Sequence, residues 1–223
     1  MGGIIPLGDA TRRPARRSAI TILLILVNVA VFVFELVYGQ GFVDRWAIIP
    51  ANITAGYAWA TIVTAMFLHA SWSHIIGNMI FLWAFGPEIE DMMGRGRYLA
   101  FYLLGGVIAM GAQVAASPGS TIPNLGASGA IAAVMGAFLV TYPRDRIKSV
   151  LFLFIFFKIT FIPASLLIGV WFLMQLVNAG QIAHHVQTGG VAYMAHVAGF
   201  IFGAVTAGLF ERRSRYAMYP DRY

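Results

Sequence analysis

The chain has 223 residues, of which 59% are hydrophobic and only 11% charged; its net charge is +6 and it has no cysteine. A soluble domain of this size carries about 25% charged residues, so most of this surface is expected to face lipid. Without cysteine, a disulfide framework and a thiolate metal site are excluded.

The first third of the chain is expected to approach, cross and then follow the membrane surface. Residues 1–17 are basic and are expected to form a short mobile tail. Residues 20–38 form an apolar run of about 20 residues, the length of a transmembrane helix. A signal peptide has a shorter apolar region with a small-residue cleavage site behind it, and this run has neither feature. Residues 39–70 are too broken to span the membrane but rich in Trp and Tyr, which favours a membrane-embedded first loop.

The remainder of the chain predicts five further spanning helices. They are expected at residues 72–89, 98–116, 127–142, 163–179 and 191–210. Residues 150–157 are too short to span and are expected to be a partly embedded connector. The predicted fold class is therefore an all-α membrane protein, a six-transmembrane-helix bundle over residues 18–211, followed by a basic tail at 212–223.

The basic residues indicate the orientation of these helices. They form clusters between apolar runs, a pattern of membrane topology rather than a nucleic-acid-binding stripe. The clusters are Arg12, Arg13, Arg16 and Arg17; Arg95 and Arg97; Arg144, Arg146 and Lys148; and Arg212, Arg213 and Arg215. With both termini in the cytoplasm, every cluster lies inside, and the three outer loops hold one basic residue, Arg45. The acidic residues Glu88, Glu90 and Asp91 next to Arg95 and Arg97 suggest a cytoplasmic ion-pair cluster.

Polar residues of three predicted helices fall at one depth. His74 with Asn78, Ser128 and His196 each lie near the outer end of their helix. Polar side chains in a span usually face a bundle interior or a watery cavity. Small residues follow Ser128 at helical spacing, and Gly199 and Gly203 share a face with His196. These two faces predict a close helix pair that brings the His196 ring to the Ser128 hydroxyl.

This arrangement has the parts of an activated nucleophile. Serine alone is a poor nucleophile and needs an adjacent base, for which histidine is the usual choice. His74 and Asn78 are four residues apart and share a helix face, where their donors would stabilise a developing oxyanion. Taken alone, a serine between glycines is more often a packing residue, and the His74–Asn78 pair would equally tie the first loop to the bundle.

At these residues the chain resembles the rhomboid family of intramembrane serine proteases. The resemblance rests on Gly-Ala-Ser-Gly at 126–129, Ala-His-Val-Ala-Gly-Phe-Ile-Phe-Gly at 195–203 and His-Ile-Ile-Gly-Asn at 74–78. Two positions depart from the family pattern. Trp59 is followed by Ala60 where many members have arginine, and Ala132 replaces a tyrosine that supports the catalytic histidine in some members.

The resemblance implies a serine-type endopeptidase, a hydrolase that cleaves peptide bonds in or near transmembrane segments with a Ser–His dyad. Ser128 would be the nucleophile, His196 the general base, and His74 and Asn78 oxyanion contributors. The implied partners are single-span membrane protein substrates and the lipid bilayer, with no nucleic acid, no metal and no cofactor. A prokaryotic plasma membrane is the expected location, with the active site open toward the outside.

Two other functions remain open at this point. A catalytically silent rhomboid-like protein would bind transmembrane segments without cutting them, but such a protein is expected to lack the serine or the histidine. A small transporter would be expected to show internal repeats and charges at the midplane, which this sequence does not.

Overall fold

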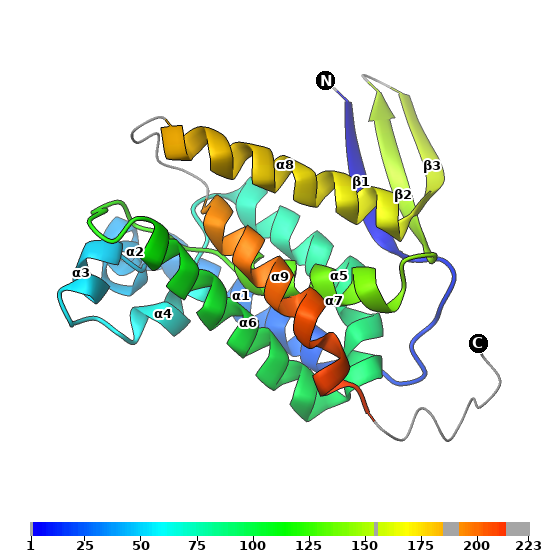
Figure 1. Ribbon diagram of the computed structural model, residues 1–223, viewed down its shortest axis with the longest axis horizontal. Coiled ribbons are helices and arrows are strands. Elements are labelled where there is room, and N and C mark those ends of the chain that lie inside the picture. Colours follow the sequence, from blue (N-terminus) through cyan, green and yellow to red (C-terminus); the bar gives the residue numbers. More distant parts are fainter. Residues whose placement is uncertain (1, 154–155, 185–191, 213–223) are drawn as a thin grey trace.

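The computed structural model describes residues 2–153, 156–184 and 192–212 and is mostly helical (Figure 1). Its long helices are α1 (Ala19–Tyr38), α5 (Trp72–Met93), α6 (Arg95–Ala116), α7 (Ser128–Thr141), α8 (Ala164–His184) and α9 (Tyr193–Phe210). The helix α7 forms the centre, since ten consecutive residues from Gly129 to Phe138 are buried. Helices α5, α6, α8 and α9 all contact α7, and α8 lies over the outside of the bundle (Figure 1).

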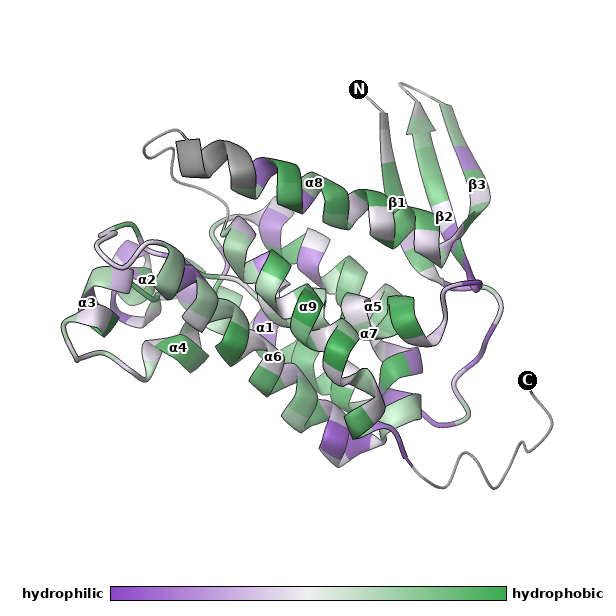
Figure 2. Ribbon diagram, viewed as in Figure 1, coloured by the Kyte–Doolittle hydropathy of each residue, from purple (hydrophilic) through white to green (hydrophobic). Residues whose placement is uncertain are grey.

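Three helices among the described residues, α1, α6 and α9, are long and apolar enough to cross a membrane. Two shorter apolar helices, α7 and Ala164–Ala179 of α8, lie beside them. The helix α5 is 22 residues long but carries acidic residues near its end. Apolar residues cover the helix bodies, and hydrophilic residues gather where α6 begins and α9 ends (Figure 2). This surface is that of a membrane protein.

The segment between α1 and α5 consists of short helices. They are α2 (Gln40–Trp46), α3 (Pro50–Thr54), α4 (Thr61–Thr64) and the 3-10 helix η1 (Ala65–Phe67). The end of this segment is held by Glu35 of α1, whose carboxylate oxygens accept from the backbone N–H of His69 at 3.0 and 3.2 Å. The loop therefore packs on the bundle directly ahead of α5.

A three-stranded antiparallel sheet corrects three of the expectations above. It joins β1 (Gly2–Asp9), β2 (Arg146–Leu153) and β3 (Phe156–Pro163) in the order β1-β2-β3. The all-α class, the embedded connector at 150–157 and the tail over residues 2–9 were therefore wrong. The physical reason lies in composition, because residues 147–162 are rich in β-branched and aromatic side chains that favour strands. The sheet extends beyond the helices next to the start of α8 (Figure 1).

The predicted boundaries of the helices agree with the structure to within a few residues where they are described. The start of the last helix and the outer loop at 180–190 fall partly outside the described residues, as does most of the tail at 212–223.

The helices α7 and α9 pack with almost no side chain between them. A Cβ atom at Gly199 would collide with the carbonyl oxygen of Gly129, and one at Gly203 with that of Ala133. A Cβ atom at Gly136 would in turn collide with the carbonyl oxygen of Phe200. The two small faces seen in the sequence therefore meet along the helices, and this contact fixes the position of α9 against α7.

Candidate active site

Ser128 is the first residue of α7 and is half-buried. The preceding turn is set by Gly126, whose φ of 130° lies in the region that favours glycine. The N–H of Gly126 donates to the carbonyl oxygen of Ala65 at 2.8 Å, which ties this turn to the first loop. As the first residue of a helix, Ser128 has a backbone N–H without an intrahelical acceptor. Its hydroxyl and this N–H thus stand together at the positive end of α7.

His196 lies on α9 directly beside Ser128. The Nε2 atom of His196 and the Oγ atom of Ser128 are 2.6 Å apart. The imidazole is only 8% exposed, so bulk water does not compete for this hydrogen bond. The glycine contacts hold α9 close to α7, and at this separation the His196 ring reaches the Ser128 hydroxyl.

The other side of the His196 ring contacts α8. The Oε1 atom of Gln175 lies 2.8 Å from Nδ1 of His196. An amide carbonyl oxygen can only accept, so Nδ1 carries the proton and Nε2 accepts from the Ser128 hydroxyl. Trp171 packs against the same ring, with centroids 5.9 Å apart and planes at 38°. These residues supply the support that Ala132 cannot give.

His74, on the first turn of α5, lies against the turn that precedes Ser128. A Cβ atom at Gly126 would come within 2.9 Å of the Nε2 atom of His74 and 3.7 Å of the Ser128 Oγ atom. The N–H of Ala70 donates to Nδ1 of His74 at 3.4 Å. In the neutral ring the proton therefore sits on Nε2, the nitrogen that faces the Ser128 turn. His74 is thus positioned as a donor.

Asn78 lies one turn further along α5 and is buried. Its Nδ2 atom donates to Nε2 of His69 at 3.0 Å. The pKa of His69 is lowered from 6.5 to about 4, mainly by burial and to a smaller extent by the neighbouring His74. His69 is therefore neutral at pH 7 and can accept this bond. This hydrogen bond uses one amide hydrogen of Asn78, and the second can be donated to another acceptor.

The four residues expected at the site thus divide into a direct pair and a neighbouring pair. Ser128 and His196 share a hydrogen bond, His74 lies against the turn before Ser128, and Asn78, one turn further along α5, is bonded to His69. The sequence reading did not identify Gln175 as part of the site. A signal was present, because Gln175 is the only amide side chain between Ala164 and Val177, in an otherwise apolar run.

Comparisons with known proteins identify similar sequences. The family model for the Rhomboid domain matches residues 56–213, which is more than half of the chain. The chain is 38% identical over 95 residues to rhomboid protease GluP of Bacillus subtilis, covering 43% of this chain and 18% of that protein. It is 27% identical over 190 residues to the mitochondrial Rhomboid protein 1 of Saccharomyces cerevisiae, covering 82% and 50%.

A further relative is the chloroplastic Rhomboid-like protein 11 of Arabidopsis thaliana, 26% identical over 224 residues, with 94% of this chain and 72% of that protein covered. The chain spans half or less of the length of the bacterial and yeast relatives. These relatives include bacterial, mitochondrial and chloroplastic proteins, so membership is compatible with each of these membranes. The match of the family model over most of the chain means that this protein belongs to the rhomboid family.

Proposed function

We propose that this chain is an intramembrane serine endopeptidase in which Ser128 and His196 form the catalytic dyad. The observation that carries the proposal is the 2.6 Å distance between Oγ of Ser128 and Nε2 of His196 at the buried end of two membrane helices. A second observation supports it, because Gln175 accepts from Nδ1 and so leaves Nε2 unprotonated, as a general base requires.

The acylation step follows from this geometry. The Ser128 Oγ atom attacks the carbonyl carbon of the scissile peptide bond while its proton passes to Nε2 of His196. The imidazolium that forms donates from Nδ1 to Oε1 of Gln175. The former carbonyl oxygen carries the negative charge, and the N–H of Ser128 and Nε2–H of His74 are donors on that side of the turn. The amide of Asn78, held by His69, is proposed as a further donor.

Breakdown of this intermediate uses the same proton. His196 gives it from Nε2 to the leaving amine as the C–N bond breaks, which leaves an acyl ester on Ser128. Water then attacks the ester carbonyl while His196 takes a proton from it. The proton returns to Ser128 Oγ as the carboxylic acid product departs. No third acid takes part, since the group behind His196 is the neutral amide of Gln175.

The membrane setting is part of the proposal. The six long helices α1, α5, α6, α7, α8 and α9 would span the bilayer as the domain of residues 18–211, with both termini in the cytoplasm. At about 1.5 Å per residue, the 14 residues of α7 cover about 21 Å, less than a hydrocarbon core of about 30 Å. Ser128 would then lie below the outer membrane surface and meet single-span substrates there. The relatives are mitochondrial and chloroplastic as well as bacterial, so they do not support the expected prokaryotic plasma membrane over an organellar one.

Cleavage of a single-span reporter protein in proteoliposomes tests this proposal. The wild-type chain is expected to produce two fragments, and His196→Ala is expected to produce none. Ser165→Ala, which removes an exposed serine at the start of α8, serves as the matched control and is expected to cut normally. A reporter that copurifies with the wild-type chain and stays intact would instead favour a catalytically silent, segment-binding relative.

A further inference from the structure

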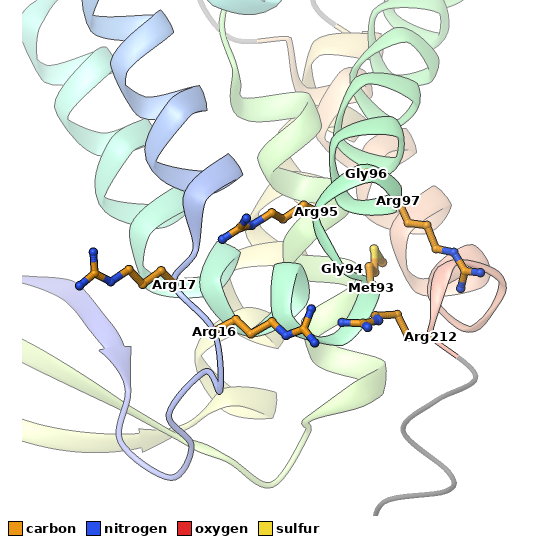
Figure 3. Close-up of a pocket in the computed structure, with 8 residues that line it drawn as sticks. All are labelled: Arg16, Arg17, Met93, Gly94, Arg95, Gly96, Arg97 and Arg212. Carbon is orange, nitrogen blue, oxygen red and sulfur yellow. The ribbon is translucent and has the colours of Figure 1, made fainter.

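An arginine-lined cavity lies at the opposite end of the bundle from the dyad. Its volume is roughly 800 Å³, and it is lined by Arg16, Arg17, Met93, Gly94, Arg95, Gly96, Arg97 and Arg212 (Figure 3). The arginines come from the segment before α1, the first turn of α6 and the second residue after α9. About 14 residues of α9 separate His196 from this end, which corresponds to about 21 Å. The cavity is therefore a separate feature from the proposed active site.

Glu90, three residues before Met93 of the cavity, is engaged elsewhere. The Glu90 carboxylate accepts from the backbone N–H groups of Ile20 and Thr21, at 3.0 and 2.8 Å, and from the Thr21 hydroxyl at 2.8 Å. It thereby caps the start of α1. Among the described residues, no carboxylate lies within ion-pair distance of the arginines that line the cavity. Glu90 therefore does not join the ion-pair cluster expected of Glu88, Glu90 and Asp91 with Arg95 and Arg97.

Two of the arginines are held by the backbone around the cavity. A Cβ atom at Gly94, where φ is 80°, would lie 2.8 Å from Cδ of Arg212, so this arginine packs directly on the glycine. The backbone N–H of Arg212 donates to the carbonyl oxygen of Met92 at 3.3 Å. Arg97 donates from Nη1 to the carbonyl oxygen of Glu211 at 2.6 Å. These contacts join the end of α9 to the start of α6.

The positive charges that line this cavity favour the binding of an anion. Arg16 and Arg212 point toward each other across the cavity next to Met93, and Arg95 lies on its α6 side (Figure 3). Like charges this close raise the local potential, which a bound anion relieves. Guanidinium groups bind phosphate oxygens through paired hydrogen bonds. The first turn of α6 adds its unpaired N–H groups and the positive end of the helix dipole.

Exposed apolar residues next to the cavity indicate which kind of anion would bind. On the last two turns of α9, which ends two residues before Arg212, Leu209 is 80% exposed and Val205 is 76% exposed. On α1, Leu23 and Leu26 are likewise exposed beyond Arg16 and Arg17. A phosphate placed among the arginines would thus have apolar helix surface beside it for hydrocarbon chains. Basic pockets between membrane helices on the cytoplasmic side typically hold anionic lipid headgroups.

We propose that this cavity binds the phosphodiester headgroup of an anionic membrane phospholipid. The arginines hold the phosphate, and the exposed faces of α1 and α9 receive the acyl chains. The site fastens together three segments that are distant in sequence, the start of α1, the start of α6 and the end of α9. It does not depend on the proposed peptidase activity.

Lipid titration of the detergent-purified full chain tests this site, with adducts counted by native mass spectrometry. The probes are phosphatidylglycerol, phosphatidylcholine and inorganic phosphate. Arg16→Gln combined with Arg95→Gln removes the charges of two exposed arginines that line the cavity. Each arginine near a membrane surface contributes about fivefold, so this variant should bind phosphatidylglycerol about 30-fold more weakly. Arg13→Gln with Arg144→Gln removes the same charge outside the cavity and should bind like wild type.

Three results would overturn the site. The first is equal loss of phosphatidylglycerol in the control and cavity variants, since bulk charge would then explain binding. The second is equal binding of phosphatidylcholine and phosphatidylglycerol by wild type. The third is inorganic phosphate binding as tightly as the lipid, which would contradict a lipid ligand. The thermal unfolding midpoint of each variant in phosphatidylcholine shows that it is folded. If the cavity variant is unfolded, Arg95→Gln alone, compared with Arg144→Gln, should bind about fivefold more weakly.

Discussion

Gly199 of α9 lies directly against the carbonyl group of Gly129 of α7, with no room for a side chain between them. This contact is one turn from His196 along α9 and one residue from Ser128 along α7. The approach of the two backbones therefore determines whether the imidazole can reach the hydroxyl. The chemistry proposed for this protein rests on a packing contact.

Gly199→Ala is expected to separate the two helices. The added methyl group must displace a backbone carbonyl, an overpacking cost of about 1–3 kcal/mol, and His196 would move away from Ser128. We expect a lower thermal unfolding midpoint and loss of peptidase activity. Gly208→Ala is the matched control on the same helix, because its Cβ atom would meet nothing within 4 Å. Equal behaviour of the two variants would refute this role of the close contact.

Gln175 is expected to be a positioning residue for His196. Gln175→Leu removes the acceptor of Nδ1–H, so kcat should fall about tenfold, the net contribution of one hydrogen bond, with KM unchanged. Gln175→Glu keeps the acceptor and adds a negative charge that favours the protonated ring, so the acid limb of the pH–rate profile should move to higher pH. Asn178→Leu on the same helix is the control. An unshifted profile in the glutamate variant would rule out contact with the base.

Asn78 is expected to contribute to stabilisation of the oxyanion. Asn78→Ala should lower kcat by about 10²–10³-fold, the loss that follows removal of one oxyanion-hole donor in a serine protease. Asn78→Asp has almost the same shape but lacks the N–H donors, so it should lose a similar factor. Steady-state cleavage of a reporter peptide measures both. If the aspartate variant kept full activity, Asn78 would be a structural residue that ties α5 to His69.

His69 makes stability depend on pH. Its pKa in the folded chain is about 4, below the ordinary 6.5, mainly because of burial. Between these values His69 binds a proton in the unfolded chain but not in the folded one, so its contribution to the free energy of unfolding falls as the pH drops from about 6.5 to 4. Glu35 and His74 are the titratable groups that contact this residue. Thermal unfolding at pH 7 and pH 5 checks this, and His69→Gln should show the smaller difference.

The helices and the contact between Ser128 and His196 could be predicted from the sequence for simple physical reasons. Apolar runs of bilayer length mark the spans, and the small residues around Ser128 and His196 mark a close helix pair. The sheet could not be predicted from the length of apolar runs. Residues 150–157 are too short to cross a bilayer, and length alone does not indicate a strand. Their Val, Ile and Phe content favours strands, and pairing with Gly2–Asp9 is a contact across the whole chain.

The supporting residues depended on tertiary structure. Gln175 contacts His196 only because α8 packs over α9, and the sequence does not state which face of that helix points inward. The arginine cavity depends likewise on Glu90, which caps α1 instead of pairing with the arginines beside it. Packing determines which of several possible partners a charged side chain contacts, so proximity in the sequence predicted the wrong partner for Glu90.

Labelling with a fluorophosphonate probe tests the central claim most directly, because this reagent reacts with a serine only when a base activates its hydroxyl. The wild-type chain in detergent should be labelled at Ser128, as identified by peptide mass spectrometry. Labelling should be absent in Ser128→Ala, strongly reduced in His196→Ala, and unchanged in Ser165→Ala. A folded wild-type chain that is not labelled, or a label that persists in Ser128→Ala, would contradict the dyad.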